Sequence, residues 1–450
     1  MKRIVILTAV IIAIAVNVCV AGPRDDLWNQ VDKAIADGLP KTAIGLLEQI
    51  IPGALADQAY AEATKAICLK IVQEARIEGG KAEELIVRLQ AEIATAPEPM
   101  KPVMEAVLAH WYWLYFQQNR WRFMQRTTTA ESPGEDIATW DLARILAEID
   151  KHFTLALCST PAPGGDSSNS TAEGGCATLL KATPIGLWSD LLEPGTVPDT
   201  YRPTLYDFLV HDALEFYNSG EQAGALPQDT FEIMADSGVF APVEEFLVWQ
   251  PQTSDTQSAK FKAIGLYQSL LAFHQNDNDK TAFLDADLYR LEFGYNQALG
   301  PEKADLYVAA LEDFVDQWAS HELSARALYE WANVVYTQEN YVRARELASE
   351  GWDAYPASVG GILCYNLILQ IESKSASIAT ERVWNEPMPD IAVTYRNVTH
   401  VFFRAVPVGY ETLIQRSSTY VNEAQFNALL ATTPALEWDA ELPATDLSMA

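Results

Sequence analysis

The chain has 450 residues, of which 49% are hydrophobic, and it carries a formal net charge of −30 at pH 7. A chain of this length and apolar content has room for several domains with buried cores. The strong negative charge excludes nucleic acid and anionic membrane surfaces as favoured partners, because both repel an acidic protein.

Residues 1–21 predict a signal peptide for export. Lys2 and Arg3 form a charged start, a run of apolar residues follows, and the small side chains of Cys19 and Ala21 match a cleavage site. We therefore expect cleavage after Ala21 and an exported protein that is periplasmic or extracellular. Lipid attachment at Cys19 is the alternative, and it is the only route by which the sequence predicts contact with a membrane.

Residues 22–160 predict an N-terminal helical domain. Apolar residues recur three and four positions apart, and Gly and Pro separate the segments. The stretch HWYWLYF, His110–Phe116, is apolar on too many sides for a surface helix and predicts a central core helix. The predicted helices are Asp26–Asp37, Lys41–Ile51, Ala56–Ala75, Ala82–Ala94, Pro99–Gln118 and Thr139–Leu157.

Residues 161–200 predict an irregular loop and linker. Cys158 and Cys176 flank its first part, STPAPGGDSSNSTAEGG, which shows no periodicity. In an oxidising compartment these two cysteines either form a disulfide that closes the loop or remain free thiols. Cys68 and Cys364 lie in apolar helical patterns and are predicted to be buried thiols.

Residues 201–374 predict a helical-repeat domain. Helices of similar length are joined by short polar connections, so neighbours should pack antiparallel. Ala325–Pro356 resembles a tetratricopeptide-type helical pair, because Trp331-Ala332, Tyr341 and Ala344 stand near the usual large and small positions. The predicted helices are Pro203–Tyr217, Lys260–Phe273, Lys280–Asn296, Ala304–Ala319, Ser324–Thr337, Tyr341–Tyr355 and Ala357–Glu372.

Residues 375–450 predict the start of a β-domain that is incomplete. Ser373–Thr380 predicts a small polar linker into it. Apolar residues alternate in Ile391–Val406, which is typical of strands, and Asn397 suits a turn or bulge within them. A short helix is expected at Asn422–Leu430.

The sequence contains no catalytic or cofactor-binding motif, so we expect neither an enzyme nor a cofactor. None of the six histidines begins a His-Glu-x-x-His pair, since His321-Glu322 lacks the second histidine, and no metal site is predicted. The P-loop, the Gly-x-Ser-x-Gly elbow and the dinucleotide fingerprint are missing. The acidic pairs Glu244/Glu245 and Asp277/Asp279 are better explained as solvated surface than as glycosidase carboxylates.

Several stretches in order resemble the N-terminal portion of large bacterial alpha-2-macroglobulin-like proteins. These stretches are Asp25–Ile50, Thr139–Leu157, Arg202–Gly220 and Ile391–Val406, the last with its Tyr-Arg-Asn-Val strand. The resemblance implies a secreted endopeptidase inhibitor that a protease cuts in a bait region and that then closes around the protease. It also implies that the C-terminal strands begin a macroglobulin-type domain.

The chain departs from this family where the trap would be. Many members carry a Cys-Gly-Glu-Gln thioester, whereas Cys176 is followed by Ala-Thr and no cysteine precedes Gly-Glu-Gln. No bait region can be assigned. We therefore expect a truncated member or split subunit that supplies a helical module and cannot itself trap a protease. The alternative is a secreted helical-repeat scaffold of the cell envelope. In both cases the expected partners are proteins, either proteases or envelope proteins.

Overall fold

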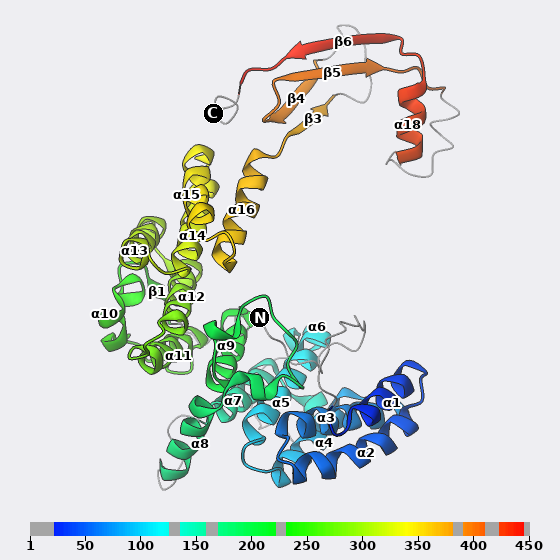
Figure 1. The fold of residues 1–450 in the computed structure, drawn as a ribbon, viewed down its shortest axis with the longest axis vertical. Coiled ribbons are helices and arrows are strands. Elements are labelled where there is room, and N and C mark those ends of the chain that lie inside the picture. Colours follow the sequence, from blue (N-terminus) through cyan, green and yellow to red (C-terminus); the bar gives the residue numbers. More distant parts are fainter. Residues whose placement is uncertain are drawn as a thin grey trace. The chain divides into compact units, whose positions relative to one another are not determined.

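The computed structural model describes residues 22–125, 136–158, 170–221, 231–380, 390–409 and 423–444. The predicted signal peptide, with Cys19 and Ala21, lies outside the described residues. The described chain is mainly helical, with a few small two-stranded sheets, as predicted (Figure 1). It divides into two compact units, Met1–Ala310 and Leu311–Ala450, called unit 1 and unit 2 below. The division falls inside the segment 201–374 that the sequence predicts as one domain.

Unit 1 is built from helices whose ends follow the Gly and Pro signals of the sequence. Gly38 has a φ of +69° and ends α1, with Leu39 N–H donating to the carbonyl of Ala34, and Pro40 opens α2. Its described helices are α1 (Asp25–Ala36), α2 (Pro40–Ala56), α3 (Tyr60–Ile77), α4 (Ala82–Thr95), α5 (Lys101–Gln118), α6 (Arg120–Met124), α7 (Leu142–Ala156), α8 (Ser170–Ala182), α9 (Leu205–Asn218), α10 (Val243–Val248), α11 (Ala259–His274) and α12 (Thr281–Gln297). Helix α13 (Lys303–Trp318) spans the division between the units.

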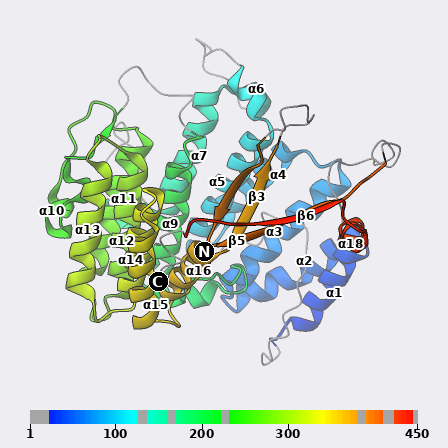
Figure 2. The same cartoon turned by 90° about the horizontal axis from the view of Figure 1, so that it is seen from above.

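Helix α5 lies at the centre of unit 1, which confirms the core helix predicted from HWYWLYF. It packs against α4, α7 and α9, and its large aromatic side chains are buried. Each such side chain contributes about 1.5–3 kcal/mol on leaving water. The neighbouring helices α11 and α12 lie side by side in both views (Figures 1 and 2). A short parallel pairing of β1 (Ile233–Met234) with β2 (Ala298–Leu299) joins two connecting segments.

Helix α9 begins two residues later than the predicted start at Pro203. Thr204 is its N-cap and forms a capping box, because its hydroxyl accepts from Asp207 N–H while the Asp207 carboxylate accepts from Thr204 N–H. This arrangement satisfies two backbone donors at the helix start. Pro203 therefore precedes the cap instead of occupying the first turn.

The segment 161–200 is less irregular than predicted, because it contains α8. Leu180 on α8 is buried, and the Lys181 ammonium lies 4.7 Å from the ring centroid of Tyr206 on α9. The Gly pair within Ser170–Ala182 suggests a loop locally, but packing on α9 favours the helix. Tertiary contacts of this kind routinely override weak propensities.

After the end of α13, unit 2 contains three closely packed helices, α14 (Leu323–Thr337), α15 (Tyr341–Ala354) and α16 (Val359–Glu372). Ala332, Ala344 and Cys364 are fully buried in their shared core. Glycine lets the backbones approach closely here. A Cβ added at Gly360 would lie 2.3 Å from the backbone nitrogen of Arg326, and one added at Gly361 would lie 1.9 Å from the backbone carbonyl oxygen of Tyr355.

The remainder of unit 2 is the strand region, meaning the described residues from Ser375 onward. It forms two separate antiparallel pairs and carries the short helix predicted near its end. The elements are β3 (Ser375–Ala379) with β4 (Ala392–Arg396), β5 (His400–Ala405) with β6 (Leu436–Glu441), and α18 (Glu423–Ala431).

The prediction of a polar linker at Ser373–Thr380 is wrong, because β3 occupies most of this segment. Its alternating Ser and Ala residues are weak strand formers, and pairing with β4 supplies the missing preference. The turn predicted at Asn397 is confirmed, with a φ of +53°. The Asn397 side-chain amide donates to the carbonyls of Ile371 (2.8 Å) and Ser373 (3.2 Å) at the end of α16. It thereby satisfies carbonyls that a helix end leaves unpaired.

Candidate functional site

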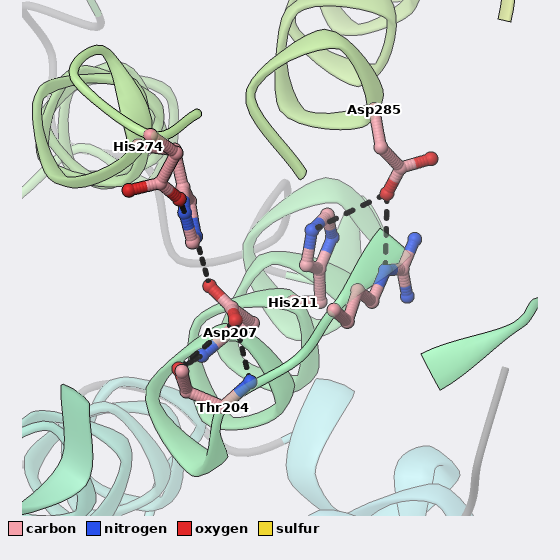
Figure 3. Close-up of polar contacts among 7 residues, drawn as sticks. Thr204, Asp207, His211, His274 and Asp285 are labelled. Carbon is pink, nitrogen blue, oxygen red and sulfur yellow. Dashed lines mark hydrogen bonds and ion pairs between the residues drawn. The ribbon is translucent and has the colours of Figure 1, made fainter. Parts of the chain in front are cut away.

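Buried charged side chains gather around α9, in the core of unit 1. Figure 3 shows the centre of this cluster, where side chains of α9, α11 and α12 converge. We use the name clasps for three His–carboxylate groups in and beside this cluster. They are His274 with Asp207 and Asp277, His110 with Asp212, and His152 with Glu105. Within the described ranges, no group of three or more His, Cys, Asp or Glu side chains is placed to hold a metal ion.

The first clasp is His274, which lies between two carboxylates. Its Nε2 is 2.7 Å from Asp207 Oδ1, and its Nδ1 is 2.7 Å from Asp277 Oδ2. Carboxylates only accept hydrogen bonds, so both ring nitrogens must donate and the imidazole carries a positive charge. Burial opposes that charge, but the hydrogen bond to Asp207, together with the charges of Asp207 and Asp277, outweighs burial and raises the pKa of His274.

Beside this clasp, Arg202 and His211 line a small cavity. Arg202 Nε donates to Asp285 Oδ2 at 3.3 Å, whereas His211 Nε2 is 4.0 Å from the same oxygen. Burial, the Arg202 charge and the charge of His274 hold the pKa of His211 well below its ordinary value, so this imidazole is neutral. The cavity measures about 20 Å³, close to the space of one water molecule.

Two further clasps join α5 to its neighbours. His110 Nε2 on α5 is 2.8 Å from Asp212 Oδ1 on α9, and His152 Nδ1 on α7 is 2.6 Å from Glu105 Oε2 on α5. Burial opposes charge on both rings. The charge and hydrogen bond of Asp212 raise the pKa of His110, and the hydrogen bond to Glu105, with the Glu148 carboxylate 3.4 Å from Nε2, raises that of His152.

The carboxylates around these pairs also respond to their neighbours. Burial opposes the charge of Glu148, but hydrogen bonds from His152 and Lys151 outweigh it and lower the pKa of Glu148 to about 2. Lys262 on α11 reaches Asp150 on α7, with nitrogen–oxygen distances of 2.7 and 2.8 Å. The network thus links α5, α7, α9 and α11.

The structure joins Cys158 and Cys176 in a disulfide between the end of α7 and α8. Cys68 and Cys364 are buried free thiols. Burial and the charge of Glu330 raise the pKa of Cys364 to about 12, and burial raises that of Cys68 further. Both therefore stay protonated at neutral pH and are poor nucleophiles.

The two acidic pairs of the sequence have different surroundings. Glu244 and Glu245 are exposed in the first turn of α10, as predicted. The other pair also lies at the surface, with Asp279 exposed and the Asp277 side chain 43% accessible, but both carboxylates make specific contacts. Asp277 completes the His274 clasp, and Asp279 accepts from the backbone of Thr281 at 3.0 Å. A histidine on the apolar face of a predicted helix, as at His110, His152 and His274, is a sequence signal for one half of each clasp, but it does not identify the carboxylate.

Unit 2 differs in two ways. It exposes several large apolar side chains, and few of its described polar side chains are buried. On β5 and β6, Phe403 and Trp438 stack with ring centroids 4.9 Å apart, and Leu436 beside them is 60% exposed. Helix α16, the last of the three packed helices, exposes Ile362, Tyr365 and Leu369 along one stripe. Such apolar patches are typical of protein-interaction surfaces.

Neither a family model nor a curated protein matches this sequence. No helix in the part of the chain that the structure describes is long and apolar enough to cross a membrane.

Proposed function

We propose that this chain is the helical N-terminal module of a secreted alpha-2-macroglobulin-like endopeptidase inhibitor. In this role it holds the first β-domain of the inhibitor and binds protein, and it neither traps a protease itself nor catalyses a reaction. Export through the signal at residues 1–21 is part of the same proposal. The observation that carries it is the junction between α16 and the strand region.

The Tyr-Arg-Asn-Val motif that carries the family resemblance lies at this junction. Asn397 caps the end of α16, and Arg396 donates to the Ser373 hydroxyl. Tyr395 O–H donates to the carbonyl of Pro443, 2.8 Å away, beyond β6. Through these hydrogen bonds the motif links β4 to the end of α16 and to the segment that follows β6. This supports a module whose task is to present a β-domain in a fixed attachment.

The strand region has the exposed apolar face of a sheet that packs against further structure. The register places Val401, Phe403 and Ala405 of β5 opposite Ala440, Trp438 and Leu436 of β6, on one side of the pair. The other side carries Phe402, which is 81% exposed, together with ion pairs between Arg404 and Glu437 and between His400 and Asp439. A β-sheet with one apolar face is stable when that face is covered, and a β-domain covers it with a second sheet.

The clasps support a structural role for unit 1 rather than catalysis. The clasp histidines His110, His152 and His274 are held by carboxylates, and the cavity beside the neutral His211 has room for about one water molecule.

The proposal is tested with the product of the complete reading frame that contains this chain. That product is incubated with a broad-specificity endopeptidase, and residual activity is measured on a protein substrate and on a small chromogenic peptide. Trapping abolishes the first activity and spares the second. The 450-residue chain, used as the control, should spare both. A complete product that spares both activities, or a frame that encodes no further β-domain, would contradict the proposal.

The second candidate is a helical-repeat scaffold that binds an envelope protein, favoured by the exposed stripe on α16. Repeat arrays normally end in a helix with a polar outer face. Here Ile362, Tyr365 and Leu369 face solvent instead. If this candidate is correct, Leu369→Glu abolishes crosslinking of the chain to envelope proteins. The matched control, Gln370→Glu on the same helix, leaves it intact.

A further inference from the structure

The three clasps connect successive helices of unit 1 in one continuous chain of contacts. His152 joins α7 to α5, His110 joins α5 to α9, and His274 joins α11 to α9. We propose that they form a pH-sensitive clamp, which holds these four helices together while the imidazoles are protonated and loosens unit 1 when they lose their protons. Unit 2 stays folded through the same change.

The charged groups around each histidine favour the protonated form. His110 faces Asp212 and Glu215 from α9, with Phe153 of α7 against its ring. His152 faces Glu105 from α5 and Glu148 from its own helix. In each case the carboxylates come from, or lie against, a neighbouring helix.

The positive charges in these surroundings are fewer than the negative ones. Lys151, on the same helix as His152, opposes its protonation, and Tyr112 of α5 stacks on its ring. His274 faces Asp207 from α9 and Asp277 from the following turn, with His211 of α9 nearby. His211 faces Arg202 and remains neutral, so it adds no positive charge beside His274.

Loss of a proton breaks a clasp because the imidazole then has one hydrogen-bond donor fewer. A neutral imidazole has one N–H, so deprotonated His274 would point a lone pair at a carboxylate oxygen 2.7 Å away. At His110 and His152 the remaining N–H can keep its bond, but the charge attraction is lost. A buried carboxylate without its cation is strongly unfavourable.

The direction of the pH effect follows from the raised pKa values. The three clasps contribute fully to stability below the ordinary histidine pKa of about 6.5, and this contribution is lost as pH rises through the raised values. His211 acts in the opposite sense. Its contribution is present above about pH 6.5 and is lost below it, so unit 1 is most stable near or just below that pH.

In the part of unit 2 that the structure describes, no histidine is buried as His152 and His274 are in unit 1. Among its described residues, the buried polar side chains are Ser324 and Ser358, which do not titrate in this range. Its ion pair between His400 and Asp439 is exposed, with side chains 34% and 58% accessible, and contributes little. The clamp therefore belongs to unit 1, and the inference does not depend on the proposed function.

The test is hydrogen exchange by mass spectrometry on the full chain at pH 6.0 and pH 8.5, corrected for the intrinsic pH dependence of exchange. Protection of α5, α7, α9 and α11 should fall about tenfold or more at pH 8.5, because each clasp then loses its charge pair. Protection of α14, α15 and α16 should not change. Equal loss in both units, or no loss in unit 1, would overturn the inference.

A combined variant, His110→Gln, His152→Gln and His274→Gln, should remove the pH dependence, whereas the matched control His400→Gln should retain it. If the combined variant does not fold, histidine ring titration by NMR on the unmodified chain decides. Three histidines titrating above pH 6.5 together with one far below it support the clamp. Ordinary titration midpoints for the three clasp histidines would refute it.

Discussion

Units 1 and 2 are both helical, but their helices are held together by different means. In unit 1, buried cations and carboxylates connect helices that are distant in sequence, as His110 and Asp212 are. In unit 2, glycine and alanine let α14, α15 and α16 pack closely, so that the backbone at Gly360 of α16 lies directly against the backbone of Arg326 in α14. One unit should therefore be sensitive to charge and the other to volume.

This difference matters because the two kinds of packing fail differently. A buried ion pair adds little net stability compared with a well-packed apolar pair, but removing one partner leaves an uncompensated charge. A close helix contact has no such charge, and it fails when a single methyl group is added. Five changes, in order of decreasing effect, test whether charge holds unit 1 together and volume limits unit 2.

Gly361→Ala should have the largest effect, because the added Cβ would lie 1.9 Å from the Tyr355 carbonyl oxygen. Backbone must move to accommodate it, so we expect unit 2 to lose about 5 kcal/mol or to remain unfolded. Hydrogen exchange should show the loss in α14–α16 and none in α5. The control is Gly45→Ala in α2, where nothing lies within 4 Å of the added Cβ. A Gly361→Ala chain as stable as this control would remove the basis for calling unit 2 volume-sensitive.

Asp207→Ala should destabilise unit 1 by about 4 kcal/mol, because it leaves the His274 charge buried without its partner. The change also removes half of the capping box at Thr204. Urea unfolding, followed by exchange in α9 and α11, measures it. A loss that appears equally in α16 would mean that the units do not respond separately.

Replacing both Cys158 and Cys176 by Ser should cost unit 1 about 3 kcal/mol, since the bond closes a loop with a sequence separation of 18. Thermal unfolding of the double variant, compared with the oxidised parent, measures the loss. The same double variant should be insensitive to reducing agent, whereas the parent should lose stability on reduction. A parent unaffected by reduction would contradict the prediction.

Glu148→Gln should reduce the acid sensitivity of unit 1. With a folded-state pKa of about 2 against an ordinary value of 4.5, Glu148 contributes stability above pH 4.5 that is lost as pH falls toward 2. We expect this loss to reach about 2 kcal/mol in the parent, and the variant to lack it. Urea midpoints between pH 3 and pH 6 provide the measurement, and parallel curves for both proteins would refute it.

Asp439→Asn in the strand region should have the smallest effect, about 0.5 kcal/mol or less, because its pair with His400 is exposed to solvent. It serves as the surface counterpart of Asp207→Ala. A cost above 2 kcal/mol would show that charge matters in unit 2 as well. The comparison of the two units would then have to be abandoned.

The helices follow from the sequence because their information is local. Periodic apolar residues, Gly38 after α1 and the aromatic run of α5 all act within a few positions. The strand β3 does not, because its Ser and Ala residues become a strand only through β4. Helix α8 likewise depends on its packing against α9.

The clasps could not be found from local patterns. His274 and Asp207 are 67 positions apart, and Lys262 and Asp150 are 112 apart, so nothing in either neighbourhood names the partner. A histidine among apolar residues indicates only that some buried partner is needed. The identity of that partner depends on the tertiary fold.

The side chain of Asn397 gives the end of α16 a mechanical property. Two hydrogen bonds from this turn hold the last carbonyls of the helix, in parallel with the covalent chain that leads into β3. Tension applied to the strands therefore reaches the helix as shear across those bonds, not only as a pull on its final peptide. Under load, the last helical turn and the turn between β4 and β5 should yield in a single event.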